Sequence, residues 1–315
     1  MNHDVQDLPG APTLEKASPS LIVEALKAVA GNPPAVRASF AKGHCVRGRY
    51  EPAAEAASIT HSKSLTRPAQ VLGRFSVGGG NPHVADTNGL VLRGFSVRLS
   101  NEAISNFLFE NAPVHFARTL DQMLAFLRAR VPAADGKPDA ERVKAFSEAN
   151  PETLNQARFV AARPLPESFA STTYWGVHSF PATSAAGKTR FIKFKIVPVG
   201  NNGISSGGDI AALDADFLRQ DLEKRIEAGN VLFDVVAILD RPGDEHLDVT
   251  KRWNDEDERP GVVLGRIIID AFEPNETCNA SIFDPAGLAD GIGHPPDEIF
   301  AARSPAYRIS LSKRS

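Results

Sequence analysis

Residues Arg74–Leu99 read RFSVGGGNPHVADTNGLVLRGFSVRL, in which two apolar runs are separated by a segment rich in Gly, Asn, Asp and Pro. The runs Gln70–Val77 and Leu90–Leu99 are rich in Val, Phe and Leu with partial alternation, a pattern typical of β-strands bounded by turns. The run His44–Tyr50 has the same character. These segments predict neighbouring antiparallel strands.

Strand character returns in the second half of the chain. Thr172–Phe180 and Arg190–Val197 flank the turn Ala185-Ala186-Gly187, and the runs Val231–Leu239 and Val262–Phe272 follow. All four are short, rich in β-branched and aromatic residues and bounded by turn formers. We therefore expect a sheet whose strands come from both ends of the chain.

Helical patterns lie before and between these strands. Residues 20–31 carry apolar side chains at helical spacing and end at Gly31. Asp139 and Pro151 provide start signals for the helices that follow them. The expected helices are residues 20–31, Ala103–Phe109, Leu120–Arg128, Ala140–Glu148, Glu152–Ala162 and Asp214–Ala228. No internal repeat or long low-complexity linker divides the chain, so the pattern favours one α+β domain.

The composition excludes several classes of protein. The 315 residues are 42% hydrophobic, and 35 Lys and Arg stand against 38 Asp and Glu, a net charge of -3 that argues against nucleic-acid binding. No stretch approaches the roughly 20 consecutive apolar residues of a membrane helix, and the polar, acidic N-terminus is unlike a signal peptide, so a cytoplasmic location is expected. Cys45 and Cys278 match no CxxC or zinc spacing and are expected to be buried or inert thiols in a reducing compartment.

Common phosphate-binding and hydrolase motifs are absent from the sequence. The glycine-rich segments Asn201–Gly208 and Gly78–Gly80 lack the Gly-Lys-Ser/Thr of a phosphate loop. The eight histidines show no HxxxH or HExxH spacing, and no serine is set in GxSxG. The acidic run Asp255–Glu258 is expected to be a solvated loop.

The segment Arg303-Ser-Pro-Ala-Tyr307 places an arginine four residues before a tyrosine. In a helix the two side chains share one face, where the guanidinium can approach the phenol oxygen. A phenol loses its proton near pH ~10, and a neighbouring arginine and a ferric iron both favour the phenolate that metal ligation requires. By itself, the spacing is equally compatible with an ordinary pair on a helix surface.

Six motifs that include this one occur in a defined order along the chain. They are FAKGHCVRGRYEP (Phe40–Pro52), the stretch Arg74–Leu99 quoted above, NAPVHF (Asn111–Phe116), YWGVHSF (Tyr174–Phe180), FDPAGLADGI (Phe283–Ile292) and RSPAY (Arg303–Tyr307). With them, the chain resembles the haem catalases, and more closely the short catalase-related peroxidases, from about residue 35 onward.

This resemblance implies a fold and a cofactor. The fold is α+β, with a closed antiparallel eight-stranded β-barrel and flanking helices but without the wrapping arm and C-terminal helical domain of full-length catalases. Residues 1–315 are expected to form a single catalase-core haem domain, in which residues 1–34 make the N-terminal helix and extension. The implied cofactor is haem b.

The resemblance also assigns roles around the haem. Tyr307 matches the proximal tyrosinate ligand of the iron, as catalases have it; Arg303 matches the arginine that pairs with it, and His178 the histidine behind that arginine. The other matches are the propionate-binding arginines Arg37, Arg74 and Arg314, and Phe116 as a further haem contact. In the alternative without haem, Arg37 and Arg74 are surface charges at strand ends and His178 is a satisfied core histidine.

On the distal side, the sequence departs from the family pattern. The family's distal histidine immediately precedes Ala-Lys-Gly, and Phe40 stands at that position. A phenyl ring cannot take or return a peroxide proton, a function that contributes about 100- to 10,000-fold in rate. Ser76 matches the serine that hydrogen-bonds the distal histidine, and Glu110 aligns with the distal asparagine of full-length catalases. We therefore expect impaired peroxide cleavage.

Three explanations of Phe40 remain open. It is a substitution that silences the enzyme, or it is natural and another group is the distal base, or the protein binds haem without fast turnover. Glu110 is the first candidate base if an apolar pocket raises its pKa, and His115 and His44 are weaker candidates. The competing interpretation of Glu110, favoured from the sequence, is a solvent-facing helix residue.

The function expected from these residues is that of a haem-dependent peroxidase. It would reduce hydrogen peroxide or organic hydroperoxides with a small electron donor and have weak or no catalase activity. One alternative is a fatty acid hydroperoxide isomerase or dehydratase resembling allene oxide synthase, and the other is a non-catalytic haem-binding protein. The expected partners are peroxide and a small reductant, without nucleic acid or a membrane span, and the relatives suggest a homodimer.

Overall fold

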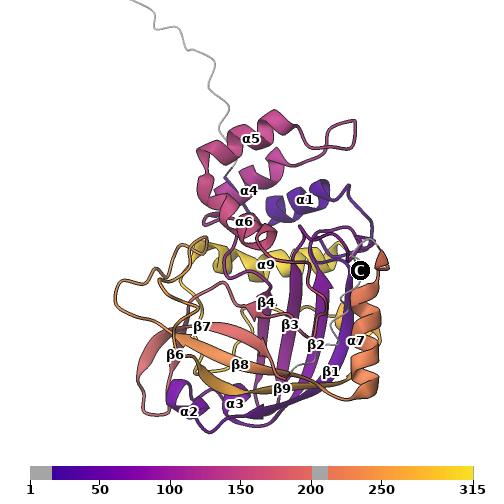
Figure 1. Ribbon diagram of the computed structural model, residues 1–315. Coiled ribbons are helices and arrows are strands. Elements are labelled where there is room, and N and C mark those ends of the chain that lie inside the picture. The colour runs from indigo at the N-terminus through magenta and orange to yellow at the C-terminus, as the bar shows by residue number, and fades with distance from the viewer. Residues whose placement is uncertain (1–15, 201–211, 315) are drawn as a thin grey trace, which may run out of the picture.

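The computed structural model describes residues 16–200 and 212–314, and its strands form one closed sheet (Figure 1). The strand order is β5-β4-β3-β2-β1-β9-β8-β7-β6, and β5 also pairs with β7, so eight strands form a ring and β6 extends it beside β7. All pairings are antiparallel. The strands are β1 (Gly43–Pro52), β2 (Ala69–Val77), β3 (Arg93–Ser100), β4 (Ile104–Glu110), β5 (Tyr174–Trp175), β6 (Phe180–Thr183), β7 (Thr189–Pro198), β8 (Val231–Leu239) and β9 (Val262–Phe272). The predicted eight-stranded barrel is confirmed.

Most of the helices gather on one side of the barrel. In Figure 1, α4, α5 and α6 lie beyond α9, which runs between them and the strands, and α1 packs against both α4 and α9. Ser18, Thr119, Asp139 and Asp297 cap the first turns of α1, α4, α5 and α9 with their side-chain oxygens. The helices are α1 (Pro19–Val29), α2 (Ala56–Ile59), α3 (Lys63–Thr66), α4 (Leu120–Ala129), α5 (Ala140–Ala149), the 3₁₀ turn η1 (Pro151–Leu154), α6 (Asn155–Ala161), α7 (Phe217–Ala228), α8 (Asn275–Asn279) and α9 (Glu298–Ser312).

Aromatic side chains fill the interior of the barrel. Phe75 and Phe95 are paired across β2 and β3, and their rings stack with centroids 4.2 Å apart. Phe169, Tyr174 and Phe233 surround them, and all five residues are fully buried. Because side chains alternate between the two faces of a strand, the neighbours of Phe75 and Phe95 point to the outer face of the barrel, under α9.

Two sequence predictions of secondary structure are wrong. Ala103–Phe109, predicted as a helix, is largely strand β4, because its backbone pairs with β3 from Gly94↔Glu110 to Ser100↔Ile104. This non-local pairing overrides the local preference. The predicted strand Thr172–Phe180 is reduced to the two-residue strand β5, and β6 begins only at Phe180. The irregular backbone between β5 and β6 carries His178.

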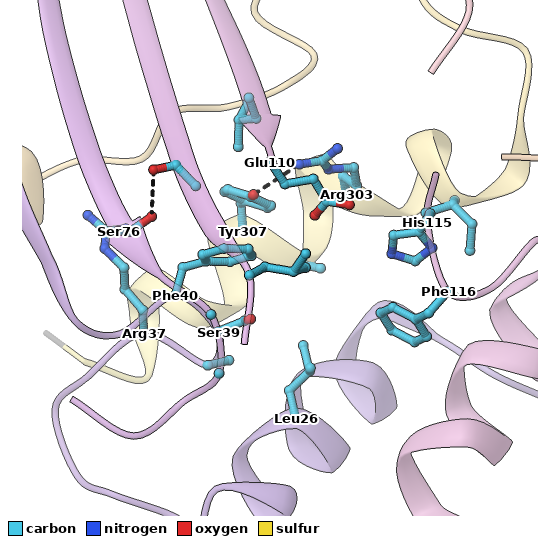
Figure 2. A pocket seen from close by; sticks show the side chains of 18 of the residues that line it. Leu26, Arg37, Ser39, Phe40, Ser76, Glu110, His115, Phe116, Arg303 and Tyr307 are labelled. Carbon is cyan, nitrogen blue, oxygen red and sulfur yellow. Dashed lines mark hydrogen bonds between the residues drawn. The ribbon is translucent and has the colours of Figure 1, made fainter. Parts of the chain in front are cut away.

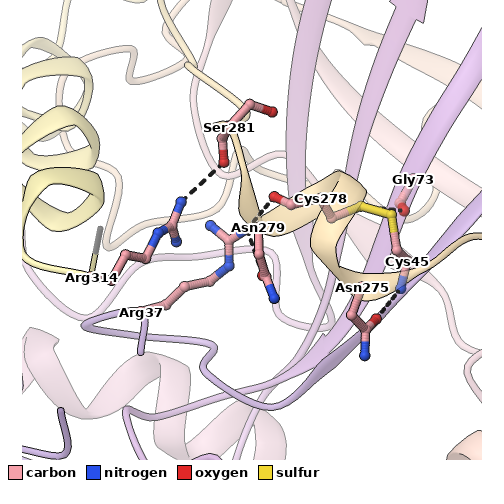
Figure 3. Close-up of a disulfide and its surroundings, with 8 residues drawn as sticks. All are labelled: Arg37, Cys45, Gly73, Asn275, Cys278, Asn279, Ser281 and Arg314. Atoms are coloured by element: carbon pink, nitrogen blue, oxygen red, sulfur yellow. Dashed lines mark hydrogen bonds between the residues drawn. A yellow bond between two sulfur atoms is a disulfide. The ribbon is translucent and has the colours of Figure 1, made fainter. Parts of the chain in front are cut away.

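The two cysteines form a disulfide, which corrects the prediction of two inert thiols (Figure 3). Cys45 on β1 and Cys278 on α8 have Cα atoms 5.8 Å apart and are buried, although 233 residues separate them in sequence. The Asn275 side chain, one turn before Cys278, accepts a hydrogen bond from the Cys45 amide. The disulfide therefore fastens α8 to the barrel, and the cysteines no longer support a reducing compartment.

Breaking this disulfide is expected to destabilise the fold. A cross-link that closes a long loop restricts the unfolded chain, and its loss lowers the free energy of unfolding by about 2–4 kcal/mol. Urea denaturation with and without reductant measures this loss, and the double variant Cys45→Ser/Cys278→Ser, insensitive to reductant, is the control. An unfolding midpoint that reductant leaves unchanged in the native sequence would contradict the cross-link.

Three further sequence predictions concern polar or apolar segments. In the acidic run Asp255–Glu258, Glu256 is buried at 4% exposure and pairs with Lys193 at 3.1 Å, so the solvated-loop prediction is wrong for this residue. The glycine-rich run Asn201–Gly208 lies outside the described residues. Within residues 16–200 and 212–314, no helix combines the length and apolar character needed to cross a membrane.

Candidate functional site

A cavity of about 470 Å³ lies between the outer face of the barrel and the helices (Figure 2). This volume is typical of sites that hold a small organic ligand or cofactor. The barrel wall contributes Ser76 from β2, Gly94 from β3 and Glu110 from β4. The opposite walls are largely apolar and comprise Ile22, Val23 and Leu26 of α1, Met123 and Phe126 of α4, Val160 of α6 and Leu90–Leu92 before β3.

A chain of hydrogen bonds reaches one end of this cavity. Arg303 and Tyr307 lie one turn apart on α9, and the Arg303 Nη2 donates to the Tyr307 Oη at 3.2 Å. The Arg303 Nη1 lies 2.8 Å from the His178 Nε2. Because a guanidinium can only donate, this Nε2 is an acceptor, and the His178 Nδ1 carries the proton that it donates to the Asp297 Oδ2 at 2.8 Å. The phenol oxygen is thus connected to a buried carboxylate.

Asp297 is a site residue that the sequence analysis missed. It is 1% exposed and has two roles, since its Oδ1 accepts the Phe300 amide at the start of α9 while its Oδ2 holds His178. The signal that could have revealed it is an aspartate at the N-cap of the helix that carries Arg303 and Tyr307. Burial raises the pKa of Asp297, but the hydrogen bonds from His178 and from the Phe300 amide, with the positive charge of Arg303, outweigh burial and lower it overall.

Electrostatics keep this chain charged at Arg303 and neutral at His178. Burial lowers the pKa of Arg303, but Tyr307, Glu110 and Asp297 together raise it above its ordinary value. Burial also lowers the pKa of His178, and Asp297 offsets this only in part. A permanent cation therefore stands beside the Tyr307 oxygen.

Three arginines converge at another part of the cavity. Arg37 donates to the Cys278 carbonyl at 2.6 Å, and Arg314 donates to the Ser281 carbonyl at 3.0 Å (Figure 3). Arg74 is 6% exposed and donates to the carbonyls of Phe40 and Ala41. Burial and mutual repulsion lower the pKa of Arg37 to about 10 and that of Arg74 to about 9.

These arginines have incomplete partners. In the described part of the chain none of them pairs with a carboxylate, and the buried Nε atoms of Arg37 and Arg314 have no hydrogen-bond acceptor. Buried cations without counter-charges are costly, and planar guanidinium groups suit carboxylates. The cluster therefore fits an anionic ligand with more than one carboxylate, which is what the two propionates of a haem provide.

Phe40 forms part of the wall opposite α9. Its backbone is in the left-handed region with φ of 52°, which is uncommon for a bulky residue. Its ring packs on Gly94, where an added Cβ would lie 2.9 Å from the Phe40 Cε1 and 2.7 Å from the Ser76 Oγ. Arg74 holds the carbonyls of Phe40 and Ala41 and so stabilises this turn. Because glycine has no side chain, Gly94 leaves space for the ring of Phe40.

Glu110 is not the solvent-facing helix residue that the sequence favoured. It is the last residue of β4 and lines the cavity, where burial raises its pKa to about 8 against the opposing effects of Arg303 and Gln156. His115 also lines the cavity, and burial lowers its pKa to about 4. His44 is not among the cavity-lining residues.

The structure gathers most of the predicted site residues in one place. Phe40, Ser76, Glu110, Phe116, Arg37, Arg74, Arg303, Tyr307 and Arg314 all line the cavity. His178 does not line it and lies behind Arg303. In the described part of the chain, no group of three or more His, Cys, Asp or Glu could hold a metal ion.

The barrel, the cavity and the pair of Tyr307 and Arg303 together define a β-barrel protein with an internal site large enough for a cofactor. The sequence pattern of the family described as Catalase matches residues 21–315. The chain belongs to the catalase family.

Relatives and solved structures agree with this assignment. The chain is 31% identical over 306 residues to a catalase-related peroxidase of Synechococcus elongatus, covering 95% of this chain and 89% of the relative. It is 27% identical to one of Mycolicibacterium paratuberculosis, covering 95% of each. A fungal catalase and a bacterial catalase share the fold, with TM-scores of 0.76 and 0.75 at 20% and 23% identity. The aligned regions cover 89% and 97% of this chain but only 59% and 62% of those two chains.

Proposed function

We propose that this protein is a haem-dependent peroxidase that reduces hydrogen peroxide or organic hydroperoxides with a small electron donor. The observation that carries the proposal is the hydrogen-bonded chain from Asp297 through His178 and Arg303 to the Tyr307 oxygen. It ends in a cavity that also presents unpaired arginines. The names of the catalase-related peroxidases to which the chain is similar support the same activity.

The residues present would hold haem b at both ends of the cavity. Tyr307 would supply an oxygen ligand to the iron, and Arg303 would hold that oxygen in place through its hydrogen bond. Arg37, Arg74 and Arg314 would bind the propionates, and Phe116 would contact the ring. The haem would supply an iron centre that exchanges electrons with peroxide and with the donor.

The protein's own contribution extends behind the ligand. His178 and Asp297 cannot reach the cavity, but they fix the guanidinium of Arg303 in one orientation and leave its other nitrogen for Tyr307. The apolar side chains of α1, α4 and α6 exclude water from the cavity and accommodate the carbon skeleton of an organic hydroperoxide. Phe40 contributes no proton carrier, which limits catalase activity and slows peroxide cleavage unless another residue takes over this role.

Haem loading followed by peroxide assays tests the proposal. The purified protein is expected to bind haem with a Soret band and to oxidise a reducing dye only when hydrogen peroxide or an organic hydroperoxide is added. Conversion of a fatty acid hydroperoxide to an epoxide without any donor would instead favour the isomerase. A haem protein that oxidises no dye, even after Phe40→His, would be a non-catalytic haem binder, and a protein that binds no haem would refute all three.

A further inference from the structure

We propose that Glu110, held by Gln156, carries the proton during peroxide cleavage in this cavity, in place of the histidine that Phe40 replaces. The proposal rests on the haem-dependent peroxide reduction proposed above and names a further catalytic residue for it. In this proposal Glu110 touches the substrate, whereas Gln156 is a positioning residue.

Glu110 lies on the same wall as Phe40. It pairs directly with Gly94 of β3, and Gly94 is the residue on which the Phe40 ring packs. On its other side, Glu110 pairs with Trp175 of β5, and its carboxyl group faces the cavity (Figure 2). A substrate that reached the space in front of Phe40 would therefore meet a carboxyl group one strand away.

Gln156 fixes one oxygen of this carboxyl group and leaves the other available. The Gln156 Nε2 donates to the Glu110 Oε1 at 2.7 Å and to the Val114 carbonyl at 2.8 Å, which engages both of its protons. Gln156 is 8% exposed on α6, so this arrangement is shielded from bulk water. Within the described residues, the Glu110 Oε2 has no hydrogen-bond partner, which leaves it for a substrate in the cavity.

The surroundings of Glu110 suit a group that both takes and returns a proton. Arg303 of α9 favours the carboxylate, whereas burial favours the protonated form and predominates, with a pKa of about 8. His115, which also lines the cavity, is neutral near pH 7 because burial lowers its pKa to about 4. α6 and β5 contribute the neutral side chains Gln156 and Trp175. Both forms of Glu110 are accessible near neutrality, which is the condition for general acid-base catalysis.

In the proposed step, the Glu110 carboxylate takes the proton from the terminal oxygen of the hydroperoxide. It returns that proton to the other peroxide oxygen, which leaves as an alcohol, or as water from hydrogen peroxide, when the O–O bond breaks. Two electrons from the small donor and two protons from solvent complete the reduction of the remaining oxygen to water. Glu110 is regenerated in each cycle.

The test compares Glu110→Gln with the matched control Glu102→Gln in haem-loaded protein, because Glu102 is exposed in the turn before β4, away from the cavity. Besides dye oxidation, it measures the rate at which hydrogen cyanide binds, because this molecule must lose its proton to bind iron as the anion and no turnover is involved. Glu110→Gln is expected to slow both processes by about 100-fold or more, and Glu102→Gln to leave both nearly unchanged. If Glu110→Gln leaves both rates unchanged, the proposal is overturned.

Gln156→Leu tests the positioning role. Loss of the donated hydrogen bond is expected to raise the pKa of Glu110 further, so the rate of cyanide binding should reach half its maximum at a higher pH. A merely structural role would change the rate without moving this profile. If Glu110→Gln fails to fold, the pH profile of cyanide binding by Gln156→Leu tests the proposal instead. A profile that is not shifted from that of the wild type excludes Glu110 as the base.

Haem-free protein supplies a separate measurement. A carboxyl group whose pKa is raised by folding loses its stabilising contribution as the pH rises through its folded pKa. Between about pH 5 and pH 8, the interval between the ordinary pKa of the carboxyl group and its folded value, the unfolding temperature of the wild type should therefore fall relative to that of Glu110→Gln. A constant difference would overturn the proposal. Failure of the wild type to bind haem would refute the proposed function as well, whereas normal haem binding with equal cyanide rates would refute only the role of Glu110.

Discussion

Tyr307→Phe is expected to abolish the Soret band of the haem-loaded protein or to shift it to that of loosely bound haem. In the proposed function, the Tyr307 oxygen is the iron ligand, and the Arg303 Nη2 donates a hydrogen bond to it at 3.2 Å. Changes to residues behind a metal ligand typically cost 10- to 100-fold in affinity, so loss of the ligand itself should weaken haem binding by more than about 100-fold. Titration of the haem-free protein with haem measures this loss.

Tyr174→Phe is the control, because it makes the same substitution at one of the other two tyrosines of the chain, which is fully buried. Its hydroxyl donates to the Phe169 carbonyl at 2.8 Å inside the barrel and does not line the cavity. Its removal should cost about 1 kcal/mol of stability and leave the haem spectrum unchanged. If the spectrum of Tyr307→Phe is also unchanged, the ligand has been assigned to the wrong residue.

Phe40→His is expected to restore peroxide turnover by about 100- to 10,000-fold in a Glu110→Gln background. Histidine tolerates the left-handed backbone at position 40 better than phenylalanine does. Its ring would replace a phenyl group that already packs beside Gly94 and Ser76. In the wild-type background the gain should be much smaller, because Glu110 already carries the proton.

The measurement is dye oxidation by the four proteins of this double-mutant cycle, which are the wild type, Phe40→His, Glu110→Gln and the double variant. Phe40→Asn is the control for the backbone, since asparagine also accepts a positive φ but supplies no base, and it should restore nothing. A gain of about 100-fold or more in the wild-type background would show instead that Phe40 alone impairs the enzyme. Equal turnover in all four proteins would mean that neither position transfers a proton.

The successes and errors of the sequence analysis have separate causes. Turn-bounded strands such as Gln70–Val77 were predictable because alternation and turn residues are local signals, and β2 spans Ala69–Val77. Ala103–Phe109 was mispredicted because its strand state comes from pairing with β3. The Cys45–Cys278 disulfide had no local signal either, since it joins residues 233 positions apart.

The candidate site likewise has one part that was predictable from local sequence and another that depends on contacts between distant segments. Arg303 and Tyr307 could be paired from the sequence because residues four apart share one helix face. The role of Asp297 depends on the approach of His178 from the segment between β5 and β6, which no spacing along the chain records. The convergence of Arg37, Arg74 and Arg314 likewise depends on the packing of the chain ends against the barrel.

The sequence by itself determined the family, the barrel and the identity of the candidate site residues, because these follow from ordered motifs and from the periodicity of each segment. Only the tertiary structure decided the ionisation, orientation and pairing of these side chains. The ionisation of Glu110, the orientation of His178 and the unpaired charge of the arginines follow from burial and from partners on other elements. Burial is a property of the packed chain, since desolvation depends on what surrounds a group in space.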